Sequence, residues 1–121
     1  MCGIFAIHSL SRELSNNDLI ERVKKVTGKL SHRGPDSSGL IFEKSSILGH
    51  TRLSIIDIDN GQQPMLSEDG NICITYNGEI YNYNEIKNDL IQRGYRFKTK
   101  SDTEVILKAF IEFGVNCLKK F

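Results

Sequence analysis

The sequence predicts a single α+β domain. Two stretches have the three- and four-residue apolar spacing of amphipathic helices, and a third opens with a helix-capping pattern. The other apolar residues fall in short runs typical of strands, which follow one another as in hairpins and do not alternate strictly with helices. The sequence contains no internal repeat, linker or low-complexity segment, and we therefore expect no second domain.

The first half of the chain is expected to contain a strand, a helix and then further strands. Residues 4–8 form a short run that is apolar on both faces, which suits a buried strand. Asn17 and Asp18 offer a helix cap before an apolar stripe at Leu19, Ile20, Val23, Val26 and Leu30. The segment HRGPDSSG (32–39) breaks this helix. Strands separated by polar turns are then predicted at 40–42, 47–50 and 52–56.

The second half is expected to end in two helices. Residues 72–77 alternate between apolar and polar side chains, as a strand does. A helical stripe follows, closed by Gly94, and consists of Tyr83, Ile86, Leu90 and Ile91. After a short strand around Phe97, SDTE (101–104) has the spacing of a capping box and opens a helix that ends at Gly114. Residues 115–121 begin a new element, so we expect the chain to be a fragment.

Composition excludes several classes of protein. Sixteen Lys and Arg against 15 Asp and Glu give a formal net charge of +1, so nucleic-acid binding by bulk electrostatics is not expected. No apolar run approaches the roughly 20 residues of a membrane span, and the N-terminus lacks the features of a secretory leader. We therefore expect a cytoplasmic protein that does not bind membranes. Cys2, Cys73 and Cys117 cannot all pair and match no zinc spacing, so we expect neither structural disulfides nor a metal site.

Cys2 is the first candidate catalytic residue. A small residue after Met1 normally allows the initiator methionine to be removed, which would make cysteine the new N-terminus. An α-amine titrates at about 7.7–8.0 and a thiol at about 8.5, so near neutral pH the amine can exchange a proton with the sulfur. On position alone, a small buried residue at the start of a strand is the commoner interpretation.

Three further positions suggest substrate recognition. Asn77 and Gly78 offer a side-chain amide and an unhindered backbone N–H, which can hold an oxyanion; a hairpin turn is the alternative. The planar fork of Arg52 suits a carboxylate, with a surface salt bridge as the alternative. Asp102 suits an ammonium group, although its place in a first helical turn already explains an acid. The loop at 32–36 has turn chemistry and is assigned no direct catalysis.

Together these groups predict a free amino acid as the substrate. The set comprises a nucleophile with its own amine, two oxyanion donors, a cation for a carboxylate and an anion for an ammonium group. An amino acid with a side-chain acyl group that a thiolate can attack points to glutamine.

Five segments, in order along the chain, carry a resemblance to a known family. They are Cys2-Gly3-Ile4, HRGPD (32–36), GHTRLSIID (49–57), YNGEIYNY (76–83) and SDTEVIL (101–107). Over essentially the whole chain, they resemble the class II glutamine amidotransferase domain of glutamine-hydrolysing asparagine synthetases. Pro35, with RLSIID and NGEIYN, is more similar to this branch than to glucosamine-phosphate synthase or the purine-pathway amidotransferase.

The resemblance implies a role for each matching residue. Cys2, freed of Met1, would be the nucleophile that forms a glutamyl thioester, and Asn77 and Gly78 would form the oxyanion hole. The residues implied to bind glutamine, besides Asn77 and Gly78, are Arg52 for the α-carboxylate, Glu79 and Asp102 for the α-ammonium group, and Leu53, Ser54, Ile55 and Ile56 as the pocket lining.

The implied fold is the N-terminal-nucleophile sandwich, in which two antiparallel sheets lie between helical layers. In the family, this domain continues past the position of Phe121 and is followed by an ATP-dependent synthetase domain that activates aspartate and receives ammonia. Residues 1–121 would then be a partial amidotransferase domain. They contain no Gly-rich phosphate loop, so we expect no cofactor in this chain, with ATP and Mg²⁺ needed only by the synthetase domain.

The expected reaction is hydrolysis of L-glutamine to glutamate and ammonia, which would supply asparagine synthesis. One alternative is a non-catalytic remnant that binds a partner through an incomplete sheet. Another is an amidotransferase whose ammonia goes to a different acceptor. Thiol-based metal or redox binding ranks last, because only three scattered cysteines favour it.

Overall fold

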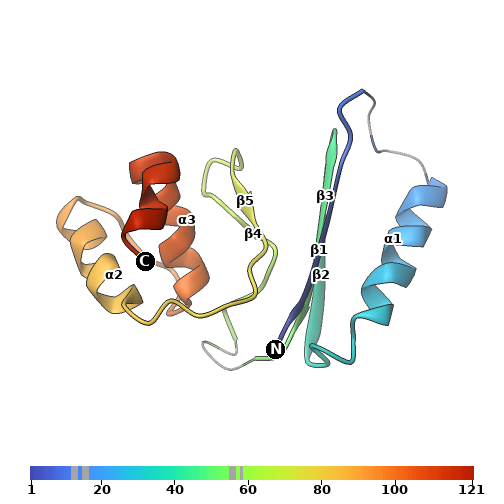
Figure 1. The fold of residues 1–121 in the computed structure, drawn as a ribbon, viewed down its shortest axis with the longest axis horizontal. Helices are drawn as coiled ribbons and strands as arrows, with labels where there is room; N and C mark the ends of the chain where they lie inside the picture. The colour runs from blue at the N-terminus through green and yellow to red at the C-terminus, as the bar shows by residue number, and fades with distance from the viewer. Residues whose placement is uncertain (12–13, 15–16, 55–56, 58) are drawn as a thin grey trace. The chain divides into compact units, whose positions relative to one another are not determined.

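The computed structural model describes residues 1–11, 14, 17–54, 57 and 59–121. The elements are β1 (Gly3–His8), α1 (Asn17–Lys29), β2 (Ser37–Glu43), β3 (Ser46–Arg52), β4 (Met65–Leu66), β5 (Cys73–Ile74), α2 (Tyr83–Gln92), α3 (Asp102–Phe113) and the 3-10 helix η1 (Gly114–Lys119) (Figure 1). Antiparallel sheets combined with helices confirm the predicted α+β class.

The described residues form two compact units whose segments alternate along the chain. The first unit consists of Met1–Ser54, Gln62–Pro64 and Thr75–Asn77, and the second of the remaining described residues. The sequence carries no sign of this division, because no linker separates the units. Among the helices of the described ranges, none has the length and apolar character needed to cross a membrane.

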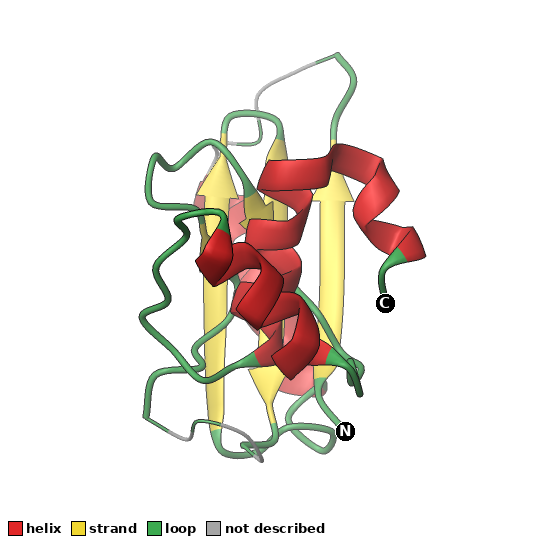
Figure 2. Cartoon of the chain, turned by 90° about the vertical axis from the view of Figure 1, so that its left-hand side faces the viewer, coloured by secondary structure: helices red, strands yellow, loops and turns green. Residues whose placement is uncertain are grey.

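The first unit is a three-stranded antiparallel sheet with α1 along one face (Figure 1). The strand order is β1-β3-β2, with the strands side by side in Figure 2. The core against α1 contains Leu14, Val23 and Ile47, with Phe5, Ile7, Leu19 and Leu40 packed around them. The prediction that residues 4–8 are buried on both faces is wrong, because Phe5 and Ile7 reach this core whereas Ile4 is 44% exposed.

The central strand β3 runs unbroken from Ser46 to Arg52, where two separate strands were predicted. Thr51 continues the strand because it pairs with Gly3 on one side and Ser38 on the other. The predicted strand at 52–56 is wrong for Leu53 and Ser54, whose backbone N–H groups donate to side chains rather than to a neighbouring strand. Ile55 and Ile56 lie outside the described residues.

The second unit combines the short hairpin β4-β5 with α2, α3 and η1. Its core consists of Ile86, Leu90, Val105, Ala109 and Cys117. The predicted helices are confirmed, and each is followed by a glycine at positive φ, +97° at Gly94 and +56° at Gly114, where a side chain would be strained. The strand predicted at 72–77 is reduced to Cys73–Ile74.

The predicted capping box of α3 is half formed. Ser101 Oγ accepts a hydrogen bond from Thr103 N at 3.1 Å, as an N-cap does. The Glu104 carboxylate accepts instead from Lys98 N, Thr99 N and Thr99 Oγ1. The strand predicted around Phe97 is therefore wrong, because the amides that follow it bond to this carboxylate. Burial raises the pKa of Glu104, but these bonds and nearby Lys108 outweigh burial and hold the pKa below its usual value.

Candidate active site

Cys2 is half-buried and lies beside the backbone that follows β3. Leu53 N donates a hydrogen bond to Cys2 Sγ at 3.3 Å, and the thiol donates to Leu53 O at 3.7 Å. Arg33 Nε donates to Cys2 O at 3.0 Å. Met1 is 74% exposed. The sulfur therefore contacts both the N–H and the C=O of one residue, Leu53, and follows an N-terminal methionine that is open to solvent.

The loop at 32–36 positions the segment that holds Cys2. A Cβ atom at Gly34 would overlap the backbone of Thr51 and Arg52, so only glycine allows the loop to lie this close to β3. Asp36 N donates to Arg52 O at 3.0 Å, and Asp36 Oδ2 accepts from Ser54 N at 2.7 Å. These contacts fix both ends of the segment 52–54.

This positioning role was missed when the loop was interpreted as turn chemistry. The available signal was the placement of Arg33 and Asp36 on either side of Gly34-Pro35. Two charged side chains at a turn are ordinarily solvated, but here each bonds to backbone far along the chain. Arg33 reaches Cys2, 31 residues away, and Asp36 reaches Ser54, 18 residues away.

Arg52 ends β3 and is only 5% exposed. A surface salt bridge, the alternative left open by the sequence, does not fit a guanidinium buried to this extent. Leu53 and Ser54 follow it as half-buried residues outside regular secondary structure. Of the predicted pocket lining, these two are described, whereas Ile55 and Ile56 are outside the described residues.

His50 precedes Arg52 by two residues and is completely buried. Its Nδ1 atom lies 3.1 Å from Thr75 Oγ1. Burial, and secondarily the positive charge of Arg52, lower the pKa of His50 from 6.5 to about 4. The imidazole is therefore neutral at physiological pH. Sequence reasoning did not single out His50 or Thr75, because nothing local links residues 25 positions apart.

We predict that His50 makes the protein less stable in mild acid. The unfolded imidazole titrates near pH 6.5 and the folded one near pH 4, so unfolding takes up a proton between these values. This contribution is complete above pH 6.5, and the free energy of unfolding falls as pH is lowered toward 4, by at most about 1.4 kcal/mol per pH unit. Urea unfolding at a series of pH values measures the slope.

The comparison variants for this slope are His50→Gln and His8→Gln. His50→Gln is expected to flatten the slope between pH 6.5 and 4.5, whereas the exposed His8 serves as the matched control and leaves it unchanged. The window stops at 4.5 because carboxylates of lowered pKa such as Glu104 lose their stabilising contribution at lower pH. A slope that persists in His50→Gln would contradict the assignment.

Asn77 ends a segment of the first unit, and Gly78 begins a segment of the second. Asn77 is half-buried, and Gly78 and Glu79 are exposed. Tyr76 N donates to Gln63 Oε1 at 2.6 Å, which takes this stretch out of the β5 ladder. The hairpin-turn alternative for Asn77-Gly78 is wrong, because no strand follows and the next element is α2.

Asp102 begins α3 and is 7% exposed. Its Oδ2 atom accepts a hydrogen bond from Ile80 N at 3.3 Å. This contact brings the carboxylate to the residue that follows Glu79, so the two predicted ammonium-binding acids belong to one neighbourhood of the second unit. The same carboxylate lies in the first turn of a helix, where an acid is also favoured by the helix dipole.

The predicted site residues thus fall into two groups. The first unit holds Cys2, Arg52, Leu53, Ser54 and Asn77, and the second holds Gly78, Glu79 and Asp102. In the first group, the nucleophile candidate contacts the residue directly after the carboxylate-binding candidate. In the second, the backbone next to one acid bonds to the other acid. Taken separately, the first group offers a thiol and a cation, and the second offers two carboxylates that suit an ammonium group.

Comparison with known proteins identifies the family of the chain. The profile of the family described as "Glutamine amidotransferase domain" matches residues 1–121. A probable asparagine synthetase [glutamine-hydrolyzing] of Schizosaccharomyces pombe is 40% identical over 117 residues, which are 97% of this chain and 20% of that protein. The corresponding protein of Dictyostelium discoideum is 44% identical over 115 residues, 94% of this chain and 20% of the relative.

A bacterial relative gives the same result. Asparagine synthetase [glutamine-hydrolyzing] 1 of Bacillus subtilis is 42% identical over 123 residues, which cover 99% of this chain and 19% of the relative. The chain spans about a fifth of the length of these relatives. The matches confirm the resemblance carried by the five sequence segments, and the chain belongs to the glutamine amidotransferase domain family.

Proposed function

We propose that this chain is the glutamine-hydrolysing part of an asparagine synthetase. It releases ammonia from glutamine through a thioester on Cys2, and the ammonia serves asparagine synthesis in the cytoplasm. The contact between Cys2 Sγ and the Leu53 backbone supports this proposal most directly, because it sets a thiol beside the buried Arg52. The names of the relatives, asparagine synthetase [glutamine-hydrolyzing], suggest the reaction class.

Removal of Met1 starts the chemistry, because it frees the α-amine of Cys2. This amine takes the thiol proton, and the sulfur attacks the side-chain carbonyl carbon of glutamine. Asn77 Nδ2 and Gly78 N donate hydrogen bonds to the resulting oxyanion. As the C–N bond breaks, the protonated amine returns its proton to the leaving nitrogen, which departs as ammonia. Water, deprotonated by the same amine, then attacks the thioester carbonyl carbon. The C–S bond breaks, the thiolate takes the proton back from the amine, and glutamate leaves.

The charged ends of glutamine are held by groups that do not react. Arg52 forms a bidentate pair with the α-carboxylate, and Glu79 and Asp102 accept hydrogen bonds from the α-ammonium group. Leu53 and Ser54 line the pocket through backbone that Asp36 holds in place. Ile55 and Ile56 complete the proposed lining from sequence alone.

The chain itself needs no cofactor for this reaction. ATP and Mg²⁺ would act in the synthetase part of a longer protein, with aspartate as the ammonia acceptor. We also propose that the two antiparallel sheets belong to the four-layer N-terminal-nucleophile sandwich, of which residues 1–121 form a part. The two sheets of the described residues and the helix on one face of the larger sheet support this proposal.

A chimeric enzyme tests the function. Residues 1–121 replace the matching segment of the Bacillus subtilis relative, which supplies the rest of the protein. We expect glutamate release from glutamine, and an intact mass that lacks Met1. The unmodified relative, assayed in parallel, verifies the assay. A folded chimera that retains Met1 or releases no glutamate would overturn the proposal and favour a non-catalytic, partner-binding role.

A further inference from the structure

His50 and Thr75 form a hydrogen bond that the proposed chemistry does not use. Thr75 Oγ1 donates to Gly49 O at 3.4 Å, so its lone pairs are free to accept from His50 Nδ1 at 3.1 Å. This pattern places the imidazole proton on Nδ1. Nε2 of the same ring is buried and has no hydrogen-bond partner among the described residues. Burial of an imidazole nitrogen that makes no hydrogen bond costs free energy, which favours a specific role for His50 over simple packing.

The bond joins two segments that end in proposed site residues. His50 lies two residues before Arg52 on β3, and Thr75 lies two residues before Asn77. Residues 75–77 belong to no strand, so no backbone ladder sets their distance from the sheet. The hydrogen bonds of Thr75 to Gly49 and His50 provide that link to the central strand.

A second contact supports the same segment from the neighbouring strand. Tyr76 N donates to Gln63 Oε1, and Gln63 itself packs on β2 so closely that a Cβ at Gly39 would overlap its carbonyl oxygen. The segment 75–77 is thus tied through Tyr76 to β2 and through Thr75 to β3. The connection through Thr75 joins the segment to β3, the strand that also contains Arg52.

We propose that His50 is a positioning residue whose hydrogen bond to Thr75 sets the distance between the Asn77 amide and Arg52. The inference rests on the proposed function, in which these two groups hold the oxyanion and the α-carboxylate of the same glutamine. Loss of the bond moves Asn77 while Arg52 stays on β3. Because the oxyanion develops only during reaction, the displacement lowers kcat far more than it raises KM.

The test compares Thr75→Val with Thr75→Ser in the chimera. Valine has the shape of threonine without the hydroxyl, and serine keeps the hydroxyl. We expect Thr75→Val to lower kcat about tenfold, since small displacements of a catalytic group cost this much or more. KM for glutamine should stay within about twofold, and Thr75→Ser should retain the kcat of the parent.

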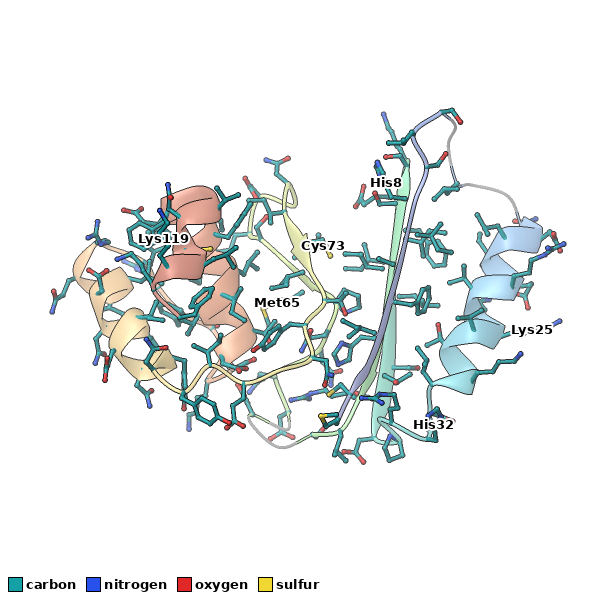
Figure 3. The ribbon with its side chains drawn as sticks, viewed as in Figure 1. His8, Lys25, His32, Met65, Cys73 and Lys119 are labelled. Atoms are coloured by element: carbon teal, nitrogen blue, oxygen red, sulfur yellow. The ribbon has the colours of Figure 1, made fainter. Side chains whose placement is uncertain are left out.

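Combining two substitutions distinguishes a positioning role from a non-specific loss of activity. If Thr75 acts through Asn77, Thr75→Val causes no further loss in an Asn77→Ala background. His50→Gln removes the imidazole, the other partner in this hydrogen bond, and should show the same non-additivity. It provides a second variant if Thr75→Val does not fold. Ser46→Ala is the matched control, because Ser46 Oγ bonds to His8 Nδ1 at 2.9 Å and Ser46 begins β3, at the opposite end of the strand from Arg52. Figure 3 labels its partner, His8. It should leave kcat unchanged.

Two results would overturn the inference. One is a Thr75→Val chimera with the kcat of the parent, and the other is an equal loss with and without Asn77. In both cases the unsubstituted chimera still releases glutamate and the proposed function stands. An unsubstituted chimera without activity marks the failure of the proposed function, and the positioning role falls with it.

Discussion

Replacing Cys2 with alanine is expected to abolish glutamate release by the chimera while leaving glutamine binding largely intact. In the proposed mechanism the sulfur forms the thioester, and no other described residue is proposed to take its place. The ion pairs assigned to Arg52 and Asp102 do not involve the sulfur, so affinity should change little. A glutaminase assay measures the rate, and calorimetry with glutamine measures binding.

The matched control for this substitution is Cys73→Ala. Cys73 is also a half-buried cysteine, but it lies on β5 of the second unit and has no role in the proposed chemistry. Its replacement should leave glutamate release unchanged. Release at the parent rate by the Cys2→Ala chimera would refute the nucleophile assignment.

Replacing Asn77 with alanine is expected to slow turnover by about 10²–10³-fold, the usual effect of removing one oxyanion donor. The second proposed donor, Gly78 N, belongs to the backbone and is retained in this variant. Affinity for glutamine should fall much less, because the amide acts on charge that develops in the transition state. Steady-state kinetics and calorimetry together separate the two effects.

Asn71→Ala provides the control for side-chain amide removal. Asn71 is exposed and bonds to Asp69 in the turn between β4 and β5, so its loss should leave turnover near that of the parent. If Asn77→Ala weakened glutamine binding as much as it slowed turnover, Asn77 would be a binding residue and the oxyanion assignment would be wrong.

The helices could be predicted from sequence because their signals are local. Apolar spacing, an N-cap such as Ser101 and a terminal glycine such as Gly94 all lie within a few residues of the element they define. Strand limits depend on distant partners. Thr51 continues β3 because Gly3 and Ser38 flank it, and no neighbouring residue reveals this pairing.

For the candidate site, too, local features could be predicted from the sequence and contacts between distant residues could not. Residue types at Cys2, Arg52 and Asn77 suggested their chemistry, since a thiol, a guanidinium and an amide each have few such uses. The supporting contacts join groups far apart in the chain, Leu53 to Cys2 over 51 residues and His50 to Thr75 over 25. Local sequence patterns do not reveal such pairings, so the supporting contacts could be identified only from the structure.

The strand order has a consequence for how the protein forms during synthesis. β1 is synthesised first, but its partner β3 begins only at Ser46. About 40 further residues must therefore be added before β1 can pair. At typical elongation rates this interval lasts roughly 2–8 s, in which the N-terminal segment has no sheet to join and Met1 stays open to processing. The segment 75–77 joins the first unit later still. A nascent chain therefore carries the thiol long before the amide that would make it reactive toward glutamine.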